Sequence, residues 1–150
     1  MIKAAQQNKV LVLCWFTETL DRLAEHFTKA GASAANLSLA QQIRKQQTEG
    51  SAIIFAEHFP IREKEGEVYE RLQLKEATVY SALDEPLLKR FGGEKIISLV
   101  KNLGANEDEA IQHSVISSSI RNAQNKLKQK VSIEQHATSQ EAWMRTNAVN

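Results

Sequence analysis

The chain has 150 residues, 42% hydrophobic and 25% charged, as expected for one globular domain with a substantial core. Lys and Arg number 19 against 18 for Asp and Glu, and this formal net charge of +1 predicts no nucleic-acid partner. No apolar run approaches the roughly 20 residues of a membrane-spanning helix, and the N-terminal segment lacks the apolar region of a signal peptide. The single cysteine, Cys14, cannot form an internal disulfide. We therefore expect a cytoplasmic protein without an integral membrane segment.

Short apolar runs predict about four strands of a parallel sheet. These runs cover residues 9–16, 34–39, 51–56 and 77–82. The first, KVLVLCWF, and the third, SAIIFA, are continuous rather than alternating. Continuous apolar runs are typical of strands that are covered on both faces.

Helical segments separate and follow these strands. We expect them over residues 17–30, 38–48, 62–74, 84–91, 94–103, about 107–130 and 139–147. Thr17 and Asn106 suit helix starts, Pro86 suits a first turn, and Gly31 and Gly104 suit helix ends. The order predicts a small three-layer α/β fold with an α-helical C-terminal extension. We expect an α/β domain over 1–104 and a helical extension over 105–150 that packs on this domain or projects from it.

The search for motifs yields no standard catalytic signature. The sequence contains neither a P-loop nor a G-x-G-x-x-G motif, and its histidines lack the spacing of zinc ligands. Cys14 lies within the first predicted strand, where a free cysteine behaves as a small hydrophobic residue. We therefore expect no catalytic residue, no metal and no cofactor.

Four residues are candidates for ligand binding. Glu57 and His58 directly follow the third predicted strand, and open α/β sheets bind ligands beyond such strand ends. A second interpretation makes His58 a loop residue that hydrogen-bonds to the backbone. Arg62 and Arg71 belong to a mixed charge run that could contact a phosphate, although such runs are more typical of a solvated helix face.

Residues 78–131 carry a series of short motifs in a fixed order. Residues 81–92 read SALDEPLLKRFG, residues 103–109 read LGANEDE, and IQH at 111–113 is followed by AQNK at 123–126. This stretch resembles the end of the second nucleotide-binding domain of the SecA preprotein translocase family and the helix that follows it. Residues 10–31 resemble the first strand and helix of a helicase-type RecA-like domain. The resemblance implies a fold of the RecA-like, helicase C-terminal type.

The sequence departs from the family where the family contacts ATP. An arginine-rich R-G-R-x-G-R-Q-G motif is typical of the family, whereas residues 69–76 here read YERLQLKE and keep only Arg71 as a counterpart. The family's phosphate loop, its magnesium site and its preprotein-binding domain have no counterpart in these residues. ATP hydrolysis needs a phosphate cradle, a magnesium ligand and a positioned water. The resemblance therefore implies a SecA-like, translocation-related module without ATPase activity of its own.

We expect this module to act through contacts with a protein partner that the sequence does not identify. The candidate surface is the apolar stripe of the long helix, through which the chain could also form a homo-oligomer. Its residues are Ile111, Val115, Ile120 and Leu127. An equally strong interpretation is that this stripe, above all its first half, covers the chain's own sheet. Two functional alternatives stay open: a regulator that binds ATP or ADP weakly at the strand ends, and a small enzyme that uses Glu57 and His58.

Overall fold

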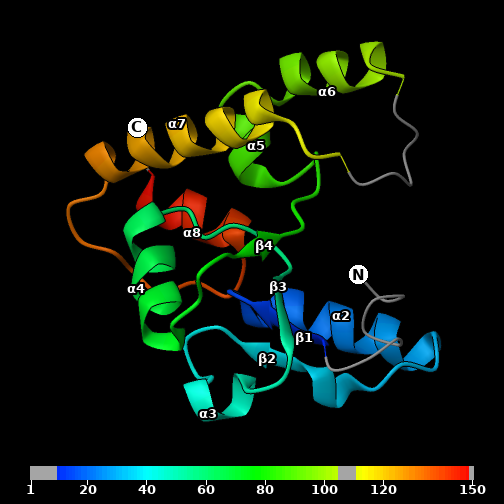
Figure 1. The fold of residues 1–150 in the computed structure, drawn as a ribbon. Helices are drawn as coiled ribbons and strands as arrows, with labels where there is room; N and C mark the ends of the chain where they lie inside the picture. The colour runs from blue at the N-terminus through cyan, green and yellow to red at the C-terminus, as the bar shows by residue number, and fades with distance from the viewer. Residues whose placement is uncertain (1–9, 105–110, 149–150) are drawn as a thin grey trace.

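The computed structural model describes residues 10–104 and 111–148. Within them, four parallel strands form one sheet with the order β2-β1-β3-β4. The strands are β1 (Val10–Cys14), β2 (Leu37–Leu39), β3 (Ala52–Phe55) and β4 (Thr78–Val79). This arrangement, with helices on both sides of the sheet, confirms the predicted small α/β fold (Figure 1).

The helices connect the strands and then continue the chain beyond the sheet. They are α2 (Thr17–Lys29), the 3-10 helix η1 (Ala34–Asn36), α3 (Lys45–Thr48), α4 (Arg62–Leu72), α5 (Pro86–Arg90), α6 (Gly93–Asn102), α7 (Ser114–Lys130) and α8 (Gln140–Asn147). None of the helices in the described residues is both long enough and apolar enough to cross a membrane.

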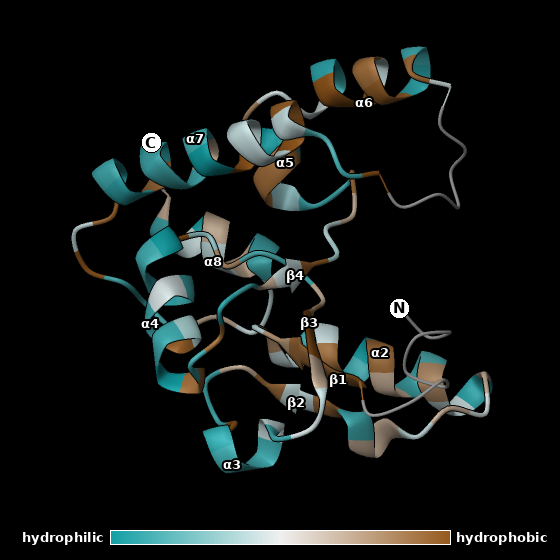
Figure 2. Cartoon of the chain, in the orientation of Figure 1, coloured by the Kyte–Doolittle hydropathy of each residue, from teal (hydrophilic) through white to brown (hydrophobic). Residues whose placement is uncertain are grey.

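The two faces of the sheet pack against different helices, because side chains alternate along each strand. On one face, Val12 packs with Phe27 of α2 in a small apolar cluster. On the other face, Leu13 and Phe55 belong to the main core, which also contains side chains of α4, α5, α6, α7 and α8. Figure 2 shows the hydrophobic residues on the strands and α5, whereas α3 and α4 are mostly hydrophilic.

The C-terminal helices are part of this core rather than a separate layer. Leu127 of α7 and Trp143 of α8 are almost completely buried in the same cluster as Leu13 and Phe55. Helix α7 contacts α5 and α4, and α8 contacts α5. The described part of the predicted extension therefore packs on the sheet domain.

Two predicted helices differ from the structure. The helix expected over 38–48 is reduced to α3, because Leu37–Leu39 instead pairs in parallel with β1 and places Leu39 opposite Cys14. The long helix was expected from about residue 107, but it begins at Ser114, where the His113 side chain accepts a hydrogen bond from the backbone N–H of Val115 at 3.1 Å. The cap predicted at Asn106 lies outside the described residues.

Candidate functional site at the carboxyl ends of the strands

The strand order creates a switch point between β1 and β3. From β1 the chain continues to β2 on one side of β1, and it then crosses to β3 on the other side. Ligands of open α/β sheets bind beside the carboxyl ends of the two strands that flank such a point. Here β1 is followed directly by Trp15 and Phe16, and β3 is followed by Ala56 and Glu57.

The Glu57 side chain spans this switch point. Its Oε1 accepts hydrogen bonds from the backbone N–H groups of Trp15 at 3.2 Å and Phe16 at 3.3 Å, and its Oε2 accepts one from the Thr19 hydroxyl at 2.8 Å. Burial raises the pKa of Glu57 to about 7, although the hydrogen bond from Thr19 opposes this shift. The carboxyl group thus ties the end of β1 and the first turn of α2 to β3.

Aromatic side chains fill the space beside Glu57. The rings of Trp15 and Phe16 lie 5.2 Å and 5.7 Å from the ring of Phe59, measured between centroids. The ring of Trp143 in α8 also packs against Phe59, edge-on at 5.9 Å. All four aromatic residues are buried. The switch point is therefore occupied by the chain's own side chains, including one from the C-terminal helix.

One polar atom in this aromatic group lacks a partner. The indole Nε1 of Trp15 is the single buried side-chain nitrogen or oxygen in the described part of the chain that makes no hydrogen bond. A buried donor without an acceptor costs about 1–3 kcal/mol. The position of Trp15 therefore depends on its ring contacts and not on its N–H group.

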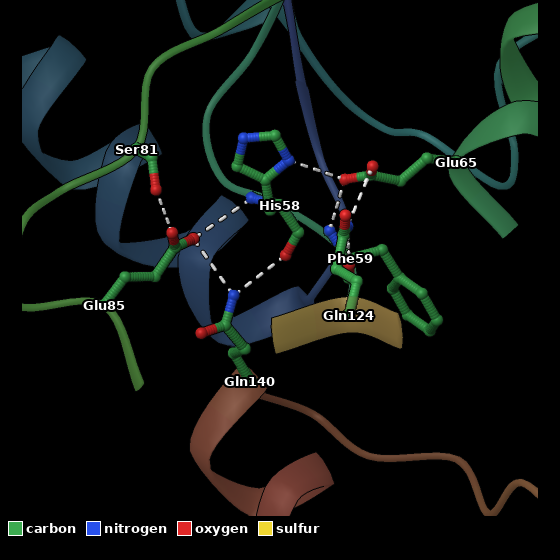
Figure 3. Close-up of polar contacts among 7 residues, drawn as sticks. All are labelled: His58, Phe59, Glu65, Ser81, Glu85, Gln124 and Gln140. Carbon is green, nitrogen blue, oxygen red and sulfur yellow. Dashed lines mark hydrogen bonds and ion pairs between the residues drawn. The ribbon is translucent and has the colours of Figure 1, made fainter. Parts of the chain in front are cut away.

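His58 lies between two buried glutamates (Figure 3). Its Nδ1 is 2.9 Å from Oε1 of Glu65, and its backbone N–H donates to Oε1 of Glu85 at 3.1 Å. Burial opposes the charged imidazole, but the hydrogen bond and the charge of Glu65 outweigh burial and raise the pKa of His58 above 6.5. Burial also raises the pKa of Glu85, whose other oxygen accepts a hydrogen bond from the Ser81 hydroxyl.

Two glutamines join the C-terminal helices to this cluster. Gln124 of α7 and Gln140 of α8 each donate to a backbone carbonyl of the loop 58–59 at 2.8 Å and to a buried glutamate at 3.0 Å. The glutamates are Glu65 for Gln124 and Glu85 for Gln140. We call these contacts, together with His58, the glutamine network (Figure 3). They attach α7 and α8 to the loop that follows β3.

Reasoning from the sequence missed both glutamines, because glutamine in a helix normally indicates a solvent-facing position. A signal was present for Gln124, which falls on the same side of the helix as Ile120 and Leu127, four residues after one and three before the other. A polar side chain within an apolar stripe indicates a buried hydrogen bond. Gln140, next to the cap residue Ser139, carried no such signal.

A cleft of about 190 Å³ opens beside the network. It lies among α4, α7 and the end of β4, and its lining residues are His58, Arg62, Glu65, Tyr69, Ala77, Val79, Ser117, Ile120, Arg121 and Gln124. Two of the predicted ligand-binding candidates, His58 and Arg62, thus line one cleft.

The other two candidates lie apart from this cleft. Glu57 contacts the β1–α2 junction, and no hydrogen bond joins its side chain to that of His58. Arg71 donates from Nη2 to the backbone carbonyl of Ala40 at 2.6 Å, which fixes the end of α4 to the segment after β2. Within residues 10–104 and 111–148, no group of three or more His, Cys, Asp or Glu side chains is arranged to hold a metal ion.

The apolar stripe of α7 is divided between the core and the surface. Ile120 is 6% exposed and Leu127 is completely buried, so these two side chains cover the chain's own core. Val115 is 46% exposed, and Ile111 is half-buried. The second half of the stripe therefore packs internally, and in the first half Ile111 also packs partly against the core.

Comparison with known proteins relates about a third of the chain to SecA. Protein translocase subunit SecA 1 of Alkaliphilus metalliredigens is 46% identical over 48 residues, which are 32% of this chain and 5% of that protein. SecA of Clostridium botulinum is 46% identical over 52 residues, 35% of this chain and 6% of that protein. SecA of Acinetobacter baumannii is 40% identical over 48 residues, 32% of this chain and 5% of that protein.

These matches confirm the SecA-related region that the sequence motifs indicated. The aligned region spans only 5–6% of the length of the relatives quoted above. No protein-family model matches the chain. The part of SecA to which the region corresponds stays a prediction.

Proposed function

We propose that this chain is a non-catalytic SecA-related module that acts through protein–protein contacts and has no ATPase activity of its own. The observation that carries the proposal is the filled switch point. Where this fold binds ligands, the Glu57 carboxyl group accepts three internal hydrogen bonds and the ring of Trp143 packs against Phe59. The similarity to translocase subunits supports a role related to protein translocation.

Three polar groups that ATP chemistry could use already have other partners. A phosphoryl-transfer site needs cations on the phosphates and a carboxylate or similar group on a magnesium ion. Arg71, the residue that resembles a phosphate-binding arginine, is hydrogen-bonded to the Ala40 carbonyl. Glu57 is held by backbone N–H groups, and Glu65 is held by the glutamine network. These contacts support a structural role for the acidic residues.

The same contacts disfavour an enzyme based on Glu57 and His58. The two side chains point to different partners, Glu57 toward Thr19 and His58 toward Glu65. General acid–base catalysis requires a group within hydrogen-bond reach of a bound substrate. Glu57 is only 7% exposed, so a substrate would first have to displace buried side chains.

The proposed contact surface is the exposed beginning of α7. Val115 is 46% exposed there, and Leu103, which follows α6, is a second exposed large apolar residue at 53%. Large apolar side chains at the surface are where protein partners gain most of their burial. A partner protein with an apolar face fits this surface, and a second copy of the chain is the alternative occupant.

The lack of turnover is tested by phosphate release from Mg-ATP with the purified chain. We expect a rate equal to that of buffer. Turnover that Glu57→Gln and Thr19→Val both abolish would contradict the proposal and assign chemistry to the switch point. An activity that survives both substitutions would indicate a contaminating ATPase, which a second purification step removes.

The contact surface is tested with Val115→Asp and with Ser118→Asp as the control at another exposed position of α7. Co-purification with the cell's translocase subunits should be lost with Val115→Asp and kept with Ser118→Asp. Sedimentation velocity on both variants measures self-association separately. Equal behaviour of the two variants in both assays would exclude this surface.

A further inference from the structure

We propose that the cleft between α4 and α7 binds a phosphate group, held by Arg62 and Arg121. This inference does not rest on the proposed function, because it requires neither ATP turnover nor a protein partner.

Two helices bring the arginines to one cleft. Along α4, Arg62, Glu65 and Tyr69 follow at intervals of three and four residues, which places them on one side of the helix. Along α7, Ser117, Arg121 and Gln124 follow in the same way. The hydrogen bond from Gln124 to Glu65 and the ion pair between Lys128 and Glu63 fix the two helices to each other.

Both arginines are exposed. Within the described residues, Arg62 and Arg121 form no hydrogen bond and no ion pair. Glu63, the acidic neighbour of Arg62 in sequence, is paired with Lys128; the hydrogen bond from Lys128 is the main cause of its lowered pKa, and the charge of Arg62 contributes less. Two guanidinium groups that line one cleft both attract an anion bound there.

The carboxylate in the cleft, Glu65, is already engaged by donors other than the arginines. It contacts the imidazole of His58, accepts the backbone N–H of Phe59 at 2.8 Å and accepts the amide of Gln124 at 3.0 Å. Its negative charge is therefore directed into the glutamine network. The two arginines leave the cleft with a surplus of positive charge.

Uncharged groups complete the site. Ile120, Val79 and Ala77 form an apolar part of the lining. Ser117 supplies a hydroxyl donor. Burial raises the pKa of Tyr69, so its hydroxyl keeps its proton and is a second donor.

The cleft is large enough for a single phosphate group but too small for a whole nucleotide. Sites for small molecules usually enclose about 300–1,000 Å³, whereas this cleft has a volume of about 190 Å³. Guanidinium groups bind phosphate in a bidentate manner, and a dianion matches two cations better than a carboxylate does. The ligand class is therefore inorganic phosphate or the phosphate of a small monoester.

The test is a titration of the ¹⁵N-labelled chain with inorganic phosphate, followed by NMR at constant ionic strength and at about pH 8, where inorganic phosphate and phosphate monoesters are both mostly dianions. Saturable shifts should be confined to amides that line the cleft, with a dissociation constant in roughly the millimolar range. A parallel titration with O-phosphoethanolamine distinguishes free phosphate from a monoester as the preferred source. Acetate, as the carboxylate probe, should bind about tenfold more weakly.

Matched variants decide whether the arginines hold the ligand. Arg62→Gln and Arg121→Gln should each weaken phosphate binding by about tenfold or more, since each removes a charge-assisted contact. Arg121→Lys should restore part of the affinity. Arg22→Gln on α2, which does not line the cleft, should leave affinity unchanged. Shifts that persist in the glutamine variants, acetate binding as strong as phosphate binding, or no response up to about 50 mM phosphate would overturn the proposal.

Discussion

Gln140→Ala tests whether the glutamine network attaches the C-terminal helix to the sheet. The amide of Gln140 accepts the backbone N–H of Leu87 at 2.8 Å and donates to the His58 carbonyl at 2.8 Å and to Glu85 at 3.0 Å. Glu85 keeps its hydrogen bonds from Ser81 and the His58 backbone after the substitution. The backbone N–H of Leu87, which is completely buried, and the backbone carbonyl of the half-buried His58 lose this side-chain partner.

Each orphaned buried group costs about 1–3 kcal/mol, so we expect Gln140→Ala to lower the free energy of unfolding by roughly 2–5 kcal/mol. The expected loss is a large fraction of the total free energy of unfolding of a typical domain, which is about 5–15 kcal/mol. Urea unfolding followed by circular dichroism measures the change, with the m-value as a check that the two-state transition is kept.

Gln129→Ala is the matched control, because Gln129 is an exposed glutamine of α7. It should change the free energy of unfolding by less than about 0.5 kcal/mol. A cost for Gln140→Ala below about 1 kcal/mol, or equal to that of the control, would refute the reasoning that these hydrogen bonds hold α8.

Three further predictions concern the site and the core. Folding raises the pKa of Glu57 from 4.5 to about 7 and that of His58 above 6.5, so the folded state holds more protons than the unfolded state. The free energy of unfolding should therefore fall as pH rises from 4.5 through 7, and Glu57 should account for on the order of 3 kcal/mol of this fall. Glu57→Gln should remove the contribution of Glu57. A free energy of unfolding that rises with pH, measured by urea unfolding, would contradict this prediction. Trp15→Phe should change thermal stability by less than about 1 kcal/mol, because the lost ring area is offset by removal of an unpaired N–H, and a larger loss would reveal a partner for that group. Leu127→Ala should lower the free energy of unfolding by about 2–5 kcal/mol, and Val115→Ala should lower it by less than about 0.5 kcal/mol. Equal losses would contradict the burial of Leu127 and the exposure of Val115.

The parts of the fold that follow from local patterns were predictable. The apolar runs around Val12 and Ile54 indicated strands covered on both faces, and both form central strands of the parallel sheet. Gly31 and Gly104 were expected at helix ends, and both have positive φ values of 70° and 73° just beyond α2 and α6. These features are determined within a few residues of sequence.

The remaining differences come from contacts between distant residues. The strand predicted over 34–39 forms as Leu37–Leu39, but the helix expected over 38–48 is reduced to Lys45–Thr48, because Leu39 pairs with the distant strand β1. The hydrogen bond from Gln140 to His58 joins residues 82 positions apart. Sequence patterns indicated that His58 follows a strand, but not that a glutamine of the last helix would hold it. The sequence therefore placed Glu57 and His58 just after a strand, as the structure does, but it did not predict the side chains that contact them.

The central claim is that the chain's own side chains close the ligand-binding edge of the sheet. The most direct measurement uses the indole N–H signals of Trp15 and Trp143, since both of the chain's two tryptophans pack against Phe59 at the switch point. Mg-ATP is added to the ¹⁵N-labelled chain, and the two indole signals are recorded together with phosphate release. The account predicts that neither indole signal shifts and that no phosphate is released. A saturable shift of the Trp15 indole signal accompanied by ATP hydrolysis would contradict it.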